Sequence, residues 1–215
     1  MDILIGLQTA NEVILVTSRA ISRGVSVLKH DDNKVVKLNS YTAMAYSGEP
    51  GDVSNFAEYI QANVALYGLR HGIEMTPNSV AAFTRSELAR SLRTRKPYQV
   101  NLLIGGFHPR EAKPMLAWVD YLGSKVDLPY AAHGYAAYYI TATLDRYWKK
   151  GLTLEQGLKL AAQCVSELQT RMPIDFKGCD VHIVGKSGIQ SADLPPIVVA
   201  PGVANKPSEA TLASA

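Results

Sequence analysis

Residues 2–20 read DILIGLQTANEVILVTSRA, two aliphatic runs joined by a short polar turn. In the first run, 2–8, isoleucine and leucine recur at every second position, and Leu4 places an apolar side chain on the opposite face as well. A strand that is apolar on both faces is typical of a sheet covered on both sides. The second run, 12–18, follows Asn11, a residue that tolerates the left-handed backbone of a tight hairpin. The stretch therefore predicts a β-hairpin that is buried on both faces.

The rest of the chain continues in runs of one element type. Strands are expected at 24–29, 34–39, 42–47, 98–106, 114–120 and 179–185, and helices are expected to begin after Gly51, at Thr76, near Ala137 and at the capping box Thr153–Gln156. Such runs argue against a doubly wound parallel sheet, in which strands and helices alternate. Because strands that are apolar on both faces need a cover on each face, we predict an α+β sandwich of two sheets with helix pairs outside.

The composition fits one soluble globular domain. The 215 residues carry a net charge of +3, and the two cysteines, Cys164 and Cys179, form neither a disulfide framework nor a zinc motif. No apolar run reaches the roughly 18 residues of a membrane span, so we expect no membrane contact. Positive charge gathers only at 90–96 (RSLRTRK), at the end of an expected helix where cations complement the helix dipole, so we do not expect nucleic-acid binding.

The composition changes near Gln190. The last stretch carries four prolines and has neither a helical nor an alternating period. We therefore expect one folded domain over 1–190 and a mobile tail over 191–215.

Three motifs of common active sites are incomplete in this sequence. The stretch VGKSG (184–188) lacks the earlier glycine of a phosphate loop, because Asp180 stands there, and no helix is expected after it. GVSVL (24–28) lacks the second glycine of a serine-hydrolase elbow. The histidines form no H-E-x-x-H pair, and we expect His133 at a helix start and His182 on a strand. The sequence therefore predicts a plain turn at 184–188 and no cofactor or metal site.

Several stretches resemble the beta subunits of the 20S proteasome, namely VILVTSRA (13–20), KVVKLN (34–39), SGEPGD (47–52) and YQVNLLIGG (98–106). Others are similar to the type-2 beta subunits, which occupy the fourth position of the eukaryotic ring and are non-catalytic: FAEYIQAN (56–63), KPYQVNLLIGG (96–106), DYLGSKVDLPYAAHGY (120–135) and RMPIDFKG (171–178). The resemblance covers about residues 1–190. It implies a four-layer αββα sandwich, which is the N-terminal nucleophile hydrolase fold.

The resemblance also implies an active-site geometry. In active members of the family a threonine at the mature amino end attacks the peptide bond, its own α-amino group helps to accept the proton, and a lysine and an aspartate lie nearby. Met1 stands at the threonine position and Thr17 at the aspartate position, whereas Lys34 and Gly48 match the lysine and a glycine of the site. Tyr135 replaces a serine before the third helix. We therefore expect a vestigial site without a nucleophile, and no catalysis by this chain.

The function implied by the resemblance is that of a non-catalytic structural subunit in the particle that degrades ubiquitin-tagged proteins. The chain would lie in a 28-subunit hetero-oligomer of the cytoplasm and nucleus, between neighbouring beta subunits, the alpha ring and the opposing beta ring. Each joint between different subunits is heterologous, so the chain needs two different contact faces. Arg93, Arg95 and Tyr98 are candidate contact residues, although a solvated basic helix end explains them equally well.

Two other functions stay open from the sequence. A hydrolase of the same fold would need a displaced nucleophile, for which Thr9, Ser124 and Cys179 are candidates. A free-standing binding module would use the basic stretch 90–96 to bind RNA or DNA in a salt-dependent way.

Overall fold

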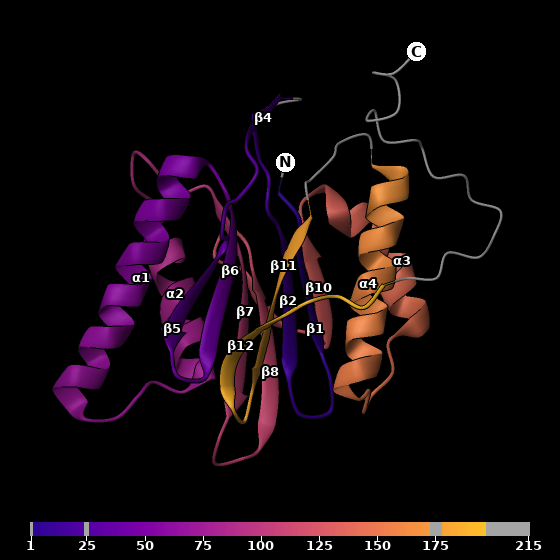
Figure 1. Ribbon diagram of the computed structural model, residues 1–215. Coiled ribbons are helices and arrows are strands. Elements are labelled where there is room, and N and C mark those ends of the chain that lie inside the picture. Colours follow the sequence, from indigo (N-terminus) through magenta and orange to yellow (C-terminus); the bar gives the residue numbers. More distant parts are fainter. Residues whose placement is uncertain (1, 24–25, 173–177, 197–215) are drawn as a thin grey trace.

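The structure is a computed structural model that describes residues 2–23, 26–172 and 178–196. Two five-stranded sheets lie face to face at its centre (Figure 1). The first sheet has the strand order β10 (Tyr130–His133), β1 (Leu4–Gln8), β2 (Val13–Ser18), β11 (Cys179–Gly185) and β12 (Gly188–Ala192). The second has the order β5 (Val35–Asn39), β6 (Thr42–Gly48), β7 (Val100–His108), β8 (Lys113–Val119) and β9 (Lys125–Asp127). All neighbouring strands are antiparallel.

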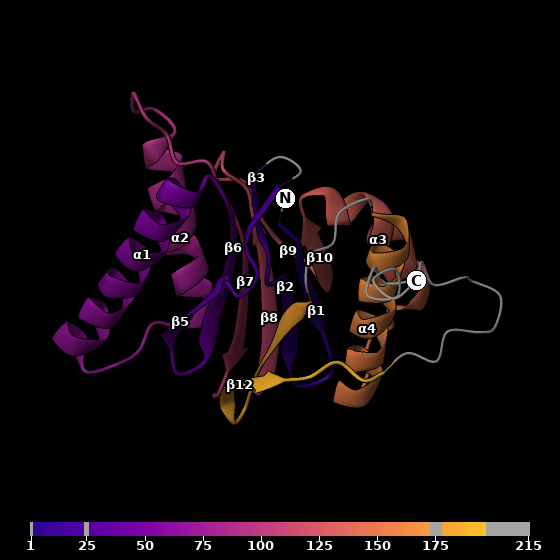
Figure 2. The ribbon, with the colours of Figure 1, turned by 45° about the horizontal axis from the view of Figure 1, so that its top comes forward.

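Two helix pairs cover the outer faces of the sheets (Figures 1 and 2). The pair on the second sheet is α1 (Pro50–His71) and α2 (Pro77–Ser91), and the pair on the first sheet is α3 (Tyr135–Tyr147) and α4 (Leu154–Arg171). The four layers confirm the predicted αββα sandwich of the α+β class. In the part of the chain that the structure describes, no helix combines the length and the apolar character needed to cross a bilayer.

Three apolar clusters fill the spaces between the four layers. On β1, Ile5 packs toward α3 and α4, whereas Leu4 packs between the two sheets, and both side chains are fully buried. Phe56 of α1 and Leu102 of β7 belong to the third cluster, on the other side of the second sheet. Burying one such side chain contributes about 1.5–3 kcal/mol relative to leaving it exposed. The opening hairpin is apolar on both faces because it lies between a helix layer and a sheet.

Two of the predicted helix starts, those of α2 and α4, are confirmed by capping bonds. The Thr76 hydroxyl accepts a hydrogen bond from the backbone N–H of Ser79 at 3.2 Å. At α4, the Gln156 N–H donates to the Thr153 hydroxyl at 3.3 Å, and the Thr153 N–H donates to the Gln156 side chain at 3.0 Å. These bonds satisfy N–H groups that a helix leaves free at its first turn.

Most of the short strands were not predicted from the sequence. The strand expected at 24–29 is confirmed over its described part as β4 (Ser26–Lys29), whereas 24–25 lie outside the described residues. Its partner β3 (Ile21–Arg23) was not predicted. The strands β9 and β10 were also missed, because three or four residues are too few to show a period. The prediction that 179–185 is the last strand is wrong, since β12 pairs with β11 across the turn correctly expected at 184–188. Residues 191–192 therefore belong to the sheet and not to the expected tail, and 197–215 lie outside the described residues.

Candidate functional site

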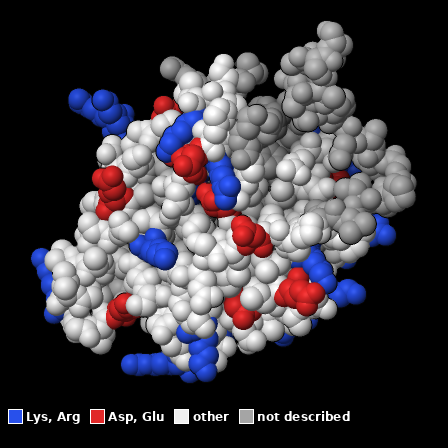
Figure 3. All heavy atoms as spheres, viewed as in Figure 1, with Lys and Arg blue, Asp and Glu red and all other residues white. Residues whose placement is uncertain are grey.

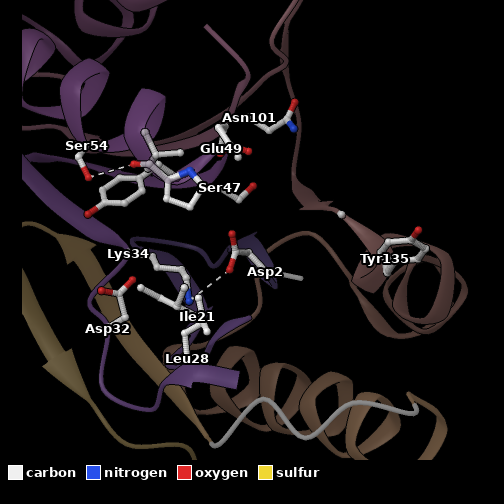
Figure 4. Close-up of a pocket in the computed structure, with 15 residues that line it drawn as sticks. Asp2, Ile21, Leu28, Asp32, Lys34, Ser47, Glu49, Ser54, Asn101 and Tyr135 are labelled. Atoms are coloured by element: carbon white, nitrogen blue, oxygen red, sulfur yellow. Dashed lines mark hydrogen bonds and ion pairs between the residues drawn. The ribbon is translucent and has the colours of Figure 1, made fainter. Parts of the chain in front are cut away.

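A pocket of about 780 Å³ opens where β1 begins and β6 ends, and we call it the Lys34 pocket. Its walls come from segments far apart in the sequence: the stretch before β1, the β3–β4 hairpin with the segment before β5, the end of β6 with the start of α1, β7, and the start of α3. Figure 4 shows the polar side chains that line it, which include Asp2, Asp32, Lys34, Ser47, Glu49 and Asn101.

Lys34 is a buried cation with a complete set of partners. Its side-chain ammonium donates to the backbone carbonyls of Ser18 at 2.7 Å and Ala20 at 2.6 Å. The carboxylate of Asp2 lies 3.4 Å from the same nitrogen (Figure 4). The Ser18 hydroxyl oxygen lies 3.5 Å away as a further acceptor, so several acceptors surround the three N–H donors of the ammonium. Lys34 therefore joins the end of β2 and the segment after it to Asp2, near the start of β1.

Thr17 lies at the position where the resemblance implies an aspartate. It is fully buried on β2, opposite Leu4 and Asp180, and its hydroxyl has no hydrogen-bond partner among the described residues. The carboxylate beside Lys34 comes instead from Asp2, a residue that the family pattern does not single out. The only signal for it was a charged residue immediately before an apolar strand.

Two glycines shape the rim of the Lys34 pocket. Gly48 ends β6 with φ +149°, and a Cβ atom there would lie 1.9 Å from the Gln99 carbonyl oxygen, so only glycine fits. Gly134 precedes α3 with φ +74°, and a Cβ atom there would lie 2.8 Å from the Asp2 carbonyl oxygen. Tyr135, the first residue of α3, is 57% exposed and lines the pocket (Figure 4).

The structure thus brings Lys34, Gly48 and Tyr135 to one pocket, as their place in the family pattern suggests. Thr17 lies next to it on β2 but does not line it. Met1 lies outside the described residues.

The candidate displaced nucleophiles lie elsewhere. The Thr9 hydroxyl donates to the Glu12 carbonyl at 3.1 Å and accepts from the Glu12 N–H at 2.9 Å, in the turn between β1 and β2. Ser124 is exposed in the turn before β9. Burial raises the pKa of the Cys179 thiol to about 12, so the thiol stays protonated at neutral pH. None of the three lines the Lys34 pocket.

The two histidines singled out in the sequence have structural surroundings. His133 ends β10, where its ring stacks on Trp118 with centroids 4.8 Å apart and its Nε2 lies 3.0 Å from the Leu102 carbonyl oxygen. Burial lowers the pKa of His133 to about 4. His182 lies on β11, as predicted. Over the described ranges, no group of three His, Cys, Asp or Glu side chains could hold a metal ion.

The candidate contact residues lie after α2. Arg93 and Arg95 are exposed, so their exposure fits both a subunit contact and a solvated helix end. Tyr98 is partly buried, and its ring centroid lies 5.1 Å from that of Phe56. Tyr98 therefore has a packing role within the chain.

Comparison with known proteins agrees with this geometry. A family model described as "Proteasome subunit" matches residues 3–184. "Proteasome subunit beta type-4" of Saccharomyces cerevisiae is 50% identical over 193 residues, which cover 90% of this chain and 98% of that protein. "Proteasome subunit beta type-2" of Dictyostelium discoideum is 34% identical over 192 residues, which cover 88% of this chain and 96% of that protein. The chain therefore belongs to the proteasome subunit family, as one of its beta subunits built on the N-terminal nucleophile hydrolase sandwich.

Proposed function

We propose that this chain is a non-catalytic structural subunit of the 20S proteasome core particle, the chamber that degrades ubiquitin-tagged proteins. The observation that carries the proposal is the set of contacts at Lys34. Its ammonium donates to the backbone carbonyls of Ser18 and Ala20 and forms an ion pair with Asp2. The residue before Asp2 is a methionine, whose thioether cannot act as an acyl-transfer nucleophile. Removing the nucleophile from such a site typically costs many orders of magnitude in rate.

In this role the chain contributes shape to the chamber wall. Its contacts are two different neighbours in the beta ring, a subunit of the alpha ring and a subunit of the opposing beta ring, within a particle of 28 subunits in the cytoplasm and nucleus. The relatives carry the type numbers 4 and 2, and the stretches that resemble type-2 subunits support the fourth ring position. In this proposal residues 1–190 are the proteasome beta-type domain, and residues 191–215 are a proline-rich C-terminal tail.

Electrophile labelling tests the lack of catalysis. Assembled particles are treated with a threonine-directed electrophile, and the mass of every subunit is then measured. We expect adducts on the active beta subunits, which serve as the internal control, and none on this chain. A covalent adduct on this chain, or peptide hydrolysis by the purified chain alone, would contradict the proposal.

Cross-linking mass spectrometry of the same particles tests the position in the ring. We expect cross-links from this chain to two different beta subunits and to an alpha subunit. Recovery of the chain from cells as a stable monomer that binds RNA or DNA would contradict a structural role and support the free-standing binding module.

A further inference from the structure

A second pocket, of about 370 Å³, lies beside the β12 edge of the first sheet and the segment that leads into β5. We call it the edge pocket and define it by Arg19, Asp31, Asp180, His182, Ser191 and Asp193. It shares none of these residues with the Lys34 pocket. Figure 3 shows acidic and basic side chains gathered near the centre of the face on which β11 and β12 lie.

The edge pocket has an excess of negative charge. Its three carboxylates face one cation, Arg19, whose Nε lies 2.7 Å from the Asp180 carboxylate. Asp31 and Asp193 have no ion pair with any described residue. The hydrogen bond to Asp180 raises the pKa of Arg19 most, and the charges of Asp31 and Asp193 raise it further. The negative charges of all three carboxylates therefore reach the Arg19 guanidinium. A cation is therefore the ligand that this field favours.

His182 adds an independent sign of a missing partner. The residue is only 8% exposed, and its Nδ1 is buried without a hydrogen-bond partner among the described residues. Burial lowers the pKa of His182, opposed by Asp180 and assisted by Lys37, so the ring is neutral at physiological pH. A neutral imidazole has one nitrogen that accepts a hydrogen bond. Buried polar groups in folded proteins are normally paired, so this ring favours a ligand with N–H donors.

The arrangement of these groups selects the kind of cation. A metal ion does not fit, because no three His, Cys, Asp or Glu side chains of the described chain converge closely enough to hold one. A guanidinium is planar and carries five N–H donors in a fixed fork, so it can reach several separated acceptors at once. A lysine ammonium is a compact point charge with three donors and matches spread acceptors less well.

We propose that the edge pocket binds an arginine side chain presented by a neighbouring protein. That the neighbour is another proteasome subunit rests on the proposed function. The guanidinium lies between Asp31 and Asp193 and next to His182, which lines the same pocket. It thus adds a second cation to a pocket that Arg19 only partly neutralises.

A ligand titration of the purified full chain tests the pocket without the assembled particle. The probe is N-acetyl-arginine amide, and the matched control is N-acetyl-citrulline amide, which has nearly the same shape without the charge. Binding is followed by the NMR signal of the His182 ring, which is assigned by its loss in His182→Gln. We expect the arginine probe to shift this signal saturably and the citrulline probe to leave it unchanged.

Three variants test which charges hold the probe. Asp193→Asn and Asp31→Asn should each weaken its affinity about threefold, the scale of one partly exposed ion pair. Arg19→Gln should tighten it, since a competing guanidinium is removed. The control, Asp127→Asn, changes an exposed acid on β9 and should have no effect. Equal binding of both probes, or unchanged affinity in all three pocket variants, would overturn the proposal. Because this test involves no particle, its failure would leave the electrophile-labelling result, and the proposed function, intact.

Discussion

The ammonium of Lys34 and the carboxylate of Asp2 lie 3.4 Å apart in the Lys34 pocket, which also contains Gly48 and Tyr135 of the family pattern. Lys34 is almost fully buried, whereas the Asp2 side chain is 21% exposed. A buried ammonium is stable only when it is paired and hydrogen-bonded. These contacts give Lys34 a structural role. The free energy of unfolding of a variant that lacks the ammonium tests this role.

Lys34→Met keeps most of the side-chain length and removes the charge. The carbonyls of Ser18 and Ala20 would lose their hydrogen bonds in a buried place, so the free energy of unfolding should fall by about 2–4 kcal/mol. Urea denaturation of the purified chain measures the change. The matched control is Lys159→Met, which breaks an exposed ion pair with Glu155 on α4 and should cost no more than about 0.5 kcal/mol. Equal effects of the two substitutions would contradict this structural role.

Gly48→Ala tests the close backbone approach at the rim of the Lys34 pocket. The new Cβ would collide with the Gln99 carbonyl oxygen, so either the end of β6 or the start of β7 must move, and unfolding should become easier by about 2–3 kcal/mol. Gly51→Ala is the control, because Gly51 lies in the first turn of α1 with open space around it. That change should leave stability unchanged or raise it by up to about 1 kcal/mol. Thermal unfolding of both variants gives the comparison, and a tolerated alanine at position 48 would refute the steric argument.

His133 should make the fold sensitive to mild acid. Its folded pKa of about 4 lies below the ordinary value of 6.5, because burial disfavours the charged ring. Between these two values the unfolded chain takes up a proton at this position and the folded chain does not, so stability is complete above about pH 6.5 and falls as the pH decreases toward 4. From about pH 7.5 to pH 5 the contribution of this ring should be a loss of about 2 kcal/mol.

Urea denaturation of His133→Gln at both pH values isolates that contribution. The variant should lose less stability than the unchanged chain over the same pH interval. His30→Gln, which alters an exposed histidine, should keep the full dependence. An unchanged pH dependence in His133→Gln would show that another group is responsible.

The two cysteines should be inert while the chain is folded. Burial raises the pKa of both Cys164 and Cys179 to about 12, so very little thiolate is present at about pH 8. Alkylation by iodoacetamide, followed by mass spectrometry, should be on the order of 100-fold slower than in urea-unfolded chain. Rapid labelling of Cys179 in the folded chain would contradict this prediction and revive the displaced-nucleophile hypothesis.

Local sequence patterns determined most of the architecture. Apolar runs, some alternating and some apolar on both strand faces, predicted the hairpin at 2–18 and the buried sheets. They do so because every second residue of a strand points to the same face, so a buried face requires apolar residues at these positions. The starts of α2 and α4 were predicted from Thr76 and Thr153, since capping bonds join residues only three positions apart. The two-sheet sandwich follows from these elements, and the resemblance added the family to which they belong.

Tertiary structure alone decided the rest. The strand β10 exists because β1 supplies its hydrogen-bond partners, with Leu4 opposite His133, and its four residues carry too little pattern to predict it. Arg19 meets Asp180 because β2 and β11 are neighbours in one sheet, and Asp2 meets Lys34 because the start of β1 and the start of β5, in different sheets, come together in the sandwich. A pattern along the chain shows which face of a strand is buried, but not which distant segment packs against that face. The contacts between the residues that line the two pockets are therefore seen only in the folded molecule.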